Sequence, residues 1–128
     1  MALRCVIVDD NAGFLRAAST LLEGEGLRIV GTASNTADAV RCAAELQPDV
    51  TLLDIDLHEE SGFDLAWRLA RDPDLRPGAL IFVSAHAEED LADLIETSPA
   101  VGFLSKAVLS AGSIERLVRA AGGRGRPR

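Results

Sequence analysis

Residues 3–10, Leu-Arg-Cys-Val-Ile-Val-Asp-Asp, form a largely apolar run rich in β-branched side chains that ends in two adjacent carboxylates. Further apolar runs without polar alternation follow at residues 27–33, 50–53, 79–83 and 101–104. Runs of this kind are typical of strands that are buried on both faces, as in a parallel sheet covered by helices. Together they predict a parallel sheet of five strands.

Between these runs the apolar residues recur at helical spacing. The stripes are Phe14, Leu15, Ala18, Leu21 and Leu22; Ala39, Val40, Ala43 and Leu46; Phe63, Ala66, Trp67 and Ala70; a weaker one at Leu91, Leu94 and Ile95; and Ile114, Leu117, Val118 and Ala121. Asn11 and Asn35 are placed to cap the first two helices. Right-handed crossovers then predict an α/β fold, a doubly wound (βα)5 sheet with the flavodoxin-like strand order 2-1-3-4-5.

Composition indicates one domain, because 128 residues with 48% apolar content are enough for a single core. Residues 1–121 are assigned to it, and residues 122–128 to a flexible basic tail or linker stub. The net charge of -7 argues against direct nucleic-acid binding. Two cysteines without metal-ligand spacing, no signal-peptide pattern and no membrane-length apolar run predict a cytoplasmic protein that does not contact membranes.

In open α/β sheets, ligands bind outside the carboxyl ends of the strands, so the residues after each apolar run are the candidates for chemistry. The first strand ends in Asp9 and Asp10, and the third ends in Asp54. These strands are neighbours in the predicted order, about 4.8 Å apart, so the three carboxylates share one pocket. Carboxylates this close raise their pKa values or gather a cation, and oxygen ligands suit Mg²⁺.

Two further polar residues end the remaining strands on this edge. Ser84 follows the fourth run, one strand from Asp54, and Lys106 follows the fifth. Lys106 is the single lysine beside twelve arginines. Its flexible stem is suited to cover much of the roughly 10 Å that separate its strand from the third. Each residue alone has an ordinary structural explanation, such as a cap or a solvated lysine, but their joint order along the strands favours a functional site.

These residues resemble the receiver domains of two-component response regulators, over residues 3 to about 121. Val6–Asn11 resembles the family's acidic pair, Leu52–Leu57 with Gly62 its phosphoacceptor segment, Phe82–Ala85 its Ser/Thr-Ala segment, and Gly102–Lys106 its switch aromatic with the lysine. The likeness is to chemotaxis-regulator-like receivers.

The resemblance implies that Asp54 is the phosphoacceptor, taking a phosphoryl group from a sensor histidine kinase or phosphotransfer protein in a phosphorelay. Asp10, the Asp54 carboxylate and the carbonyl of Asp56 would hold Mg²⁺, with Asp9 joining through water. Lys106 would balance charge on the moving phosphoryl group. The domain would be a signalling switch rather than an enzyme, with only self-phosphorylation and self-dephosphorylation chemistry.

The resemblance also implies how the signal is transmitted. Ser84, with a catalytic and a switch role, would move toward the phosphoryl group, and Phe103 would turn inward. The face made by the fourth helix, fifth strand and fifth helix would change as a result. Asp56 and His86 are expected to tune dephosphorylation. The output partner or fused effector domain stays open, as does a dimer formed on phosphorylation.

Two positions depart from the family pattern, since His58 and Ala107 stand where prolines are frequent. A trans bond is expected before Ala107, because a cis bond before a residue other than proline costs about 2.5–4 kcal/mol. One alternative is a pseudo-receiver that binds partners without phosphorylation, which would gain nothing from clustered carboxylates. The other is a haloacid-dehalogenase-type phosphatase, whose Asp-x-Asp motif normally follows the first strand rather than the third.

Overall fold

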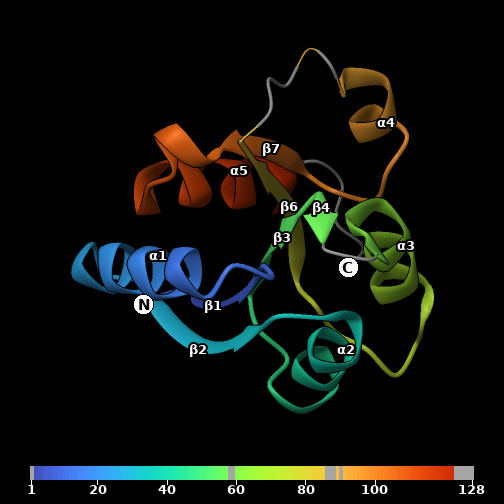
Figure 1. Cartoon of the computed structure of the whole chain (residues 1–128), viewed down its shortest axis with the longest axis horizontal. Helices are drawn as coiled ribbons and strands as arrows, with labels where there is room; N and C mark the ends of the chain where they lie inside the picture. The colour runs from blue at the N-terminus through green and yellow to red at the C-terminus, as the bar shows by residue number, and fades with distance from the viewer. Residues whose placement is uncertain (1, 58–59, 86–88, 90, 123–128) are drawn as a thin grey trace.

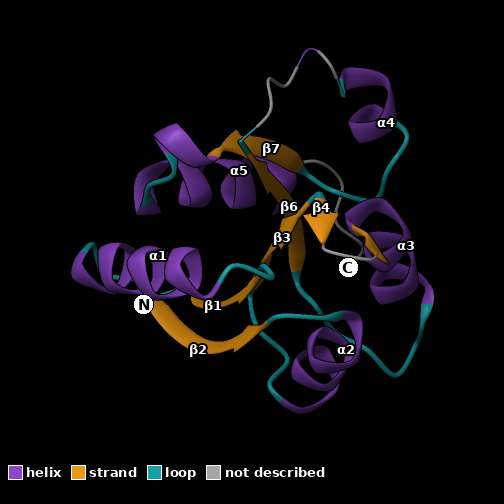
Figure 2. Cartoon of the chain, in the orientation of Figure 1, coloured by secondary structure: helices purple, strands orange, loops and turns teal. Residues whose placement is uncertain are grey.

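The computed structural model describes residues 2–57, 60–85, 89 and 91–122. Its main sheet has five parallel strands in the order β2-β1-β3-β6-β7 (Figures 1 and 2). The strands are β1 (Arg4–Val8), β2 (Arg28–Ala33), β3 (Val50–Asp54), β6 (Ala79–Ser84) and β7 (Gly102–Ser105). Because β6 and β7 are the fourth and fifth strands of this sheet, the predicted flavodoxin-like order is confirmed.

Helices cover both faces of the sheet. They are α1 (Ala12–Gly24), α2 (Thr36–Glu45), α3 (Gly62–Arg71), α4 (Ala92–Glu96) and α5 (Ala111–Gly122), with a 3₁₀ turn, η2 (Lys106–Val108), after β7. α1 and α5 lie on one face, and α2, α3 and α4 on the other (Figure 1). Each crossover therefore returns the chain to a parallel strand and brings the strand ends to one edge.

Each face of the sheet has its own core, because successive residues of a strand point to opposite sides. Val8, Leu53 and Phe82 pack under α2 and α3. Their neighbours in sequence pack under α1 and α5, and these are Ile7, Leu52 and Ile81. Strands buried on both faces explain why the apolar runs show no alternation.

The predicted caps of the first two helices are confirmed. The side-chain oxygen of Asn11 accepts a hydrogen bond from the Phe14 amide at 3.0 Å, and that of Asn35 accepts one from the Asp38 amide at 2.8 Å. Each bond satisfies an amide that has no partner within the first helical turn. The cap of α1 also sets the direction in which the helix leaves β1, beside the acidic pair.

Replacing Asn35 by alanine should lower the free energy of unfolding by about 1 kcal/mol, because the Asp38 amide loses its acceptor. Chemical denaturation of the wild type and the variant measures the difference. Asn35→Asp keeps an acceptor at the same position and should retain most of the stability. Equal losses in both variants would contradict a capping role.

A second, two-stranded sheet was not predicted. β4 (Asp56–Leu57) pairs antiparallel with β5 (Glu60–Ser61) between β3 and α3. Residues 58–59 between them, which include His58, lie outside the described residues. Gly62 ends the hairpin where the chain passes so close to the backbone of Asp54 and Ile55 that a side chain would clash. The hairpin therefore folds back over the end of β3.

None of the helices within the described part of the chain has the length and apolar character needed to cross a bilayer.

Candidate phosphoacceptor site

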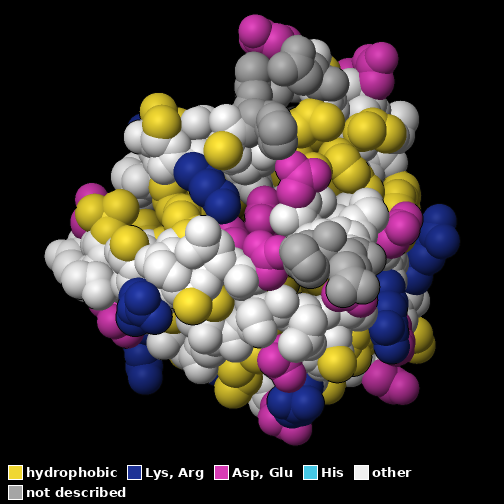
Figure 3. Space-filling model, viewed as in Figure 1, with side chains coloured by type: hydrophobic (Ala, Val, Ile, Leu, Met, Phe, Trp, Pro, Cys, Tyr) yellow, Lys and Arg dark blue, Asp and Glu magenta, His cyan; other side chains and the backbone are white. Residues whose placement is uncertain are grey.

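Three carboxylates meet at the carboxyl edge of the sheet, as predicted. Asp54 ends β3, while Asp9 and Asp10 follow β1, which pairs with β3 through Val8 and Leu53. One oxygen from each carboxylate lies within 4.8 Å of the others. Asp9 is 1% exposed and Asp54 7%, whereas Asp10 is open to solvent. The cluster thus has two buried carboxylates and one that solvent can reach. Figure 3 shows acidic side chains near the centre of this face of the molecule.

Burial sets the electrostatics of Asp54. Desolvation and then the neighbouring charge of Asp9 raise the pKa of the Asp54 carboxyl from 3.8 to about 6. The Lys106 ammonium and the amide of Asp56 act in the opposite direction. The Asp56 amide lies 3.3 Å from Asp54 Oδ1 and donates to it. The carboxyl is therefore mostly ionised at pH 7 but easily protonated in mild acid.

The two carboxylate oxygens of Asp9 contact different groups. Its Oδ1 accepts a hydrogen bond from the Asn11 amide at 2.8 Å. Its Oδ2 is buried and lies 2.8 Å from Lys106 Nζ, a charge contact without the angle of a hydrogen bond. This oxygen therefore keeps capacity for a further ligand, and the oxygen-only donor set fits a hard cation such as Mg²⁺.

Lys106 reaches farther than the sequence predicted. The expectation was that it would extend toward Asp54, but its ammonium pairs with Asp9, beyond β3. It also lies 4.2 Å from the centroid of the Phe14 ring. Sequence reasoning placed Phe14 only in the core stripe of its helix and missed this contact. The sequence signal that could have indicated this contact is the aromatic residue, Phe14, in the first helical turn after the acidic pair.

Of the two switch candidates, Ser84 occupies the predicted strand end and Phe103 lies within a strand. Ser84 ends β6 and is 1% exposed, and Phe103 lies half-buried in β7 opposite Phe82. The bond before Ala107 is trans, as expected, in a described part of the chain without cis peptides. Asp56 is exposed in β4. His86 lies outside the described residues.

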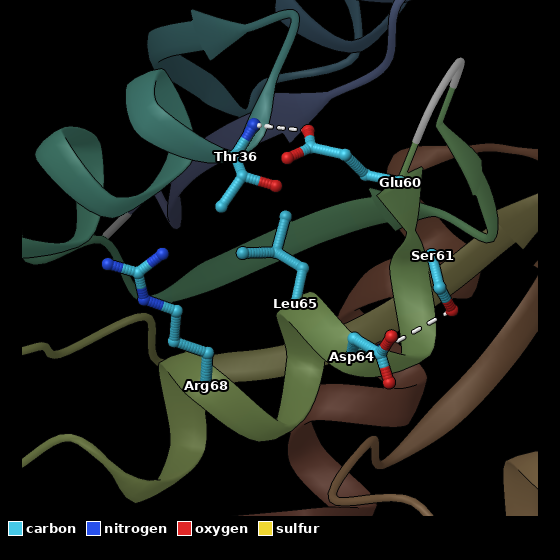
Figure 4. A pocket seen from close by; sticks show the side chains of 6 residues that line it. All are labelled: Thr36, Glu60, Ser61, Asp64, Leu65 and Arg68. Atoms are coloured by element: carbon cyan, nitrogen blue, oxygen red, sulfur yellow. Dashed lines mark hydrogen bonds between the residues drawn. The ribbon is translucent and has the colours of Figure 1, made fainter.

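A polar hollow of about 350 Å³ lies between the start of α2, β5 and α3, and none of the three clustered carboxylates lines it (Figure 4). Its lining includes Thr36, Glu60 and Arg68. The Glu60 carboxylate accepts a hydrogen bond from the Thr36 amide at 3.0 Å. Hydrogen bonding with the Thr36 side chain, and then with this amide, lowers the pKa of Glu60. The hydrogen bond to the Thr36 amide connects the β4–β5 pair to the start of α2. The sequence did not predict this contact.

Known proteins are similar to this chain in sequence and in fold. A protein-glutamate methylesterase/protein-glutamine glutaminase of Halobacterium salinarum is 32% identical over 91 residues, which are 71% of this chain and 25% of that protein. The signal receiver domain of a modulated diguanylate cyclase from Desulfovibrio desulfuricans G20 is 28% identical, with a TM-score of 0.75 and 94% of both chains covered. The response regulator domain of Thermotoga maritima CheB is 25% identical, with a TM-score of 0.75 and coverage of 94% and 96%.

The chain spans about a quarter of the length of that methylesterase. Residues 5–119 match the family described as the response regulator receiver domain. This match includes every strand of the main sheet except the first residue of β1, and all of the acidic cluster. The chain therefore belongs to the response regulator receiver domain family.

Proposed function

We propose that this domain accepts a phosphoryl group on Asp54, with Mg²⁺ as cofactor, from a histidine kinase or phosphotransfer protein. The observation that carries the proposal is the meeting of Asp9, Asp10 and Asp54 beside Lys106 at the carboxyl edge of the sheet. A nucleophilic carboxylate has to be ionised at neutral pH, and an Asp54 pKa of about 6 meets this requirement.

In the proposed step, an Asp54 carboxylate oxygen forms a bond to phosphorus while the P–N bond of a phosphohistidine breaks. The imidazole leaves after taking up a proton, and an acyl phosphate remains on Asp54. Asp10, Asp54 and the carbonyl of Asp56 would hold Mg²⁺ directly, and Asp9 through water. Bound there, Mg²⁺ would neutralise charge on the phosphoryl oxygens.

Incubation with a small phosphodonor and Mg²⁺ tests the proposal against its two alternatives. A receiver takes up one phosphoryl group stably enough to be seen by intact-protein mass spectrometry. A pseudo-receiver takes up none, and a haloacid-dehalogenase-type phosphatase turns over a phosphomonoester continuously. The position of Asp54-Ile55-Asp56 at the end of β3, rather than after the first strand, favours the receiver.

The proposed response begins at Ser84, whose buried hydroxyl stands at the end of the strand beside β3. A phosphoryl group adds about -1.5 to -2 charges, which would attract the Ser84 hydroxyl. Phe103, half-buried on the neighbouring strand, would then turn inward and reshape the face made by α4, β7 and α5. This face is the proposed output surface.

Replacing Lys106 by alanine should leave part of the phosphoryl uptake but remove the conformational response. The Asp54 nucleophile and the acidic cluster remain, while the cation that would balance the phosphoryl charge is lost. Mass spectrometry measures uptake, and amide NMR shifts of β7 and α5 measure the response. If the variant showed the same amide shift changes on phosphorylation as the wild type, this role of Lys106 would be contradicted. Lys106→Arg tests whether a positive charge alone is enough for the response.

The proposed dephosphorylation pair, Asp56 and His86, predicts coupled effects on the lifetime of the acyl phosphate. Hydrolysis needs a water in line with phosphorus, and both side chains are expected to flank its approach. Alanine at either position should alter the decay rate by about 2- to 10-fold, and the double variant should depart from the product of both effects. Decay measurements on all four proteins decide this, and strictly multiplicative rates would exclude a pair.

We further propose a domain boundary and a cellular compartment for the chain. Residues 1–121 would form the receiver, and the tail or linker stub proposed for residues 122–128 lies outside the described residues from residue 123 on. Cys5 and Cys42 are free thiols, which agrees with action in the cytoplasm. The methylesterase activity in a relative's name belongs to a protein of which this chain spans only a quarter. The output partner would be a fused effector domain or a separate protein.

A further inference from the structure

Lys106, the single lysine of the chain, is held by two groups at once. Its ammonium lies 2.8 Å from Asp9 Oδ2 and 4.2 Å from the centroid of the Phe14 ring. Among the described residues, the carboxylate in ion-pair contact with it is that of Asp9, not that of Asp54. The lysine therefore lies on the α1 side of the cluster, near Asp54 but outside ion-pair contact with it.

The Phe14 ring is well placed to hold a cation. Asn11 caps α1 through the Phe14 amide, and the ring packs half-buried against the core beneath α1 and α5. The ring is thus fixed by the helix, whereas the lysine stem is flexible. A cation over an aromatic face is attracted by the negative charge of the ring's π system. Phe14 consequently orients the lysine without needing to move.

We infer that Phe14 is a positioning residue that, with Asp9, holds Lys106 in a resting position and opposes its transfer to a group on Asp54. The functional half of this inference rests on the proposed phosphoacceptor role. For the ammonium to pair with a phosphoryl group, it has to leave the ring and the Asp9 carboxylate. Removing the ring should therefore weaken the resting position and favour the phosphorylated arrangement.

The cation–π contact sets the expected change in affinity for a phosphoryl mimic. A partly exposed cation–π contact corresponds to about a two- to fivefold change in an equilibrium constant. Phe14→Leu should accordingly bind beryllofluoride, a phosphoryl mimic, about two- to fivefold more tightly in the presence of Mg²⁺. Phe14→Tyr keeps an aromatic face and should bind it as the wild type does.

The experiment uses protein labelled with ¹³C at the lysine Cε, which gives one side-chain signal because the chain has one lysine. In the wild type and Phe14→Tyr, the ring current should shift this signal upfield of the value for free lysine. In Phe14→Leu it should return to that value. Phe63→Leu is the matched control, because Phe63 is also half-buried but its ring packs at a tilt against Phe82 instead. Phe14→Met provides a second ringless variant if leucine disturbs folding.

The resting contact of Lys106 and the opposition to its transfer are tested by different measurements. An unshifted lysine signal in the wild type, or a shift that persists in both ringless variants, overturns the resting contact. Beryllofluoride binding that is unchanged or weaker in the ringless variants overturns the opposition to transfer. A ring-shifted signal together with no beryllofluoride binding by any of the proteins leaves the resting contact standing and removes the phosphoacceptor function.

Discussion

Replacing Asp54 by asparagine is expected to abolish phosphoryl uptake while the domain stays folded. The amide cannot act as the nucleophile, so the expected loss is complete rather than partial. The change conserves side-chain volume at a site that is 7% exposed, so the surrounding core should not repack. Intact-protein mass spectrometry after incubation with a small phosphodonor and Mg²⁺ measures uptake.

The same variant should be more stable than the wild type at pH 7. Ionised Asp54 is disfavoured by its burial and by the charge of Asp9, which raise its pKa to about 6. Removing this charge should raise the free energy of unfolding by about 1–3 kcal/mol.

Asp74→Asn is the matched control, because it makes the same chemical change at an exposed residue before β6, on the opposite edge of the sheet. It should retain phosphoryl uptake and change stability little. Normal uptake by Asp54→Asn would show that the nucleophile lies elsewhere. Loss of uptake together with an unfolded spectrum would make the variant uninformative about chemistry, and the stability measurement separates these two results.

The features that the sequence predicted correctly depend on local or periodic signals. Unbroken apolar runs marked the strands of the main sheet, and short polar side chains marked the caps at Asn11 and Asn35. The acidic cluster followed from topology, because neighbouring parallel strands bring their carboxyl ends together. The sequence alone therefore places Asp9 and Asp54 in one pocket.

The features that were missed depend on contacts between distant side chains or on very short elements. β4 and β5 have two residues each, too few to show a strand period. α4 covers only Ala92–Glu96, which fits its weak apolar stripe. The partner of Lys106 depends on how far a flexible stem extends across two neighbouring strands, and no sequence spacing encodes that distance.

Protons and Mg²⁺ are expected to compete for the acidic cluster, and this competition should make stability depend on pH in a recognisable way. The folded-state pKa of Asp54 is raised to about 6, above its ordinary value of 3.8. The neutral carboxyl is thus favoured by folding. Without Mg²⁺, its contribution to stability should be fully present below about pH 4 and lost as the pH rises through 6.

The chain has 20 acidic residues, so the quantity to follow is the difference in the free energy of unfolding between the wild type and Asp54→Asn. At pH 4 the two proteins should have nearly equal free energies of unfolding, and at pH 7 the wild type should be lower by about 1–3 kcal/mol. Denaturation at several pH values in the presence of a chelator measures this difference. A difference that does not change with pH would contradict a raised Asp54 pKa.

Mg²⁺ should raise the free energy of unfolding of the wild type at pH 7 and so remove its difference from Asp54→Asn. The reason is that a ligand that binds only the folded state stabilises that state. Since the cation needs the ionised carboxylates, its affinity should fall by about tenfold for each pH unit below 6. Calorimetric titration at pH 7 and pH 5 measures the change. Asp10→Asn should weaken binding most, because Asp10 is the exposed acid of the cluster and the proposed direct ligand. Tight binding that survives both acid and Asp10→Asn would place the metal site elsewhere.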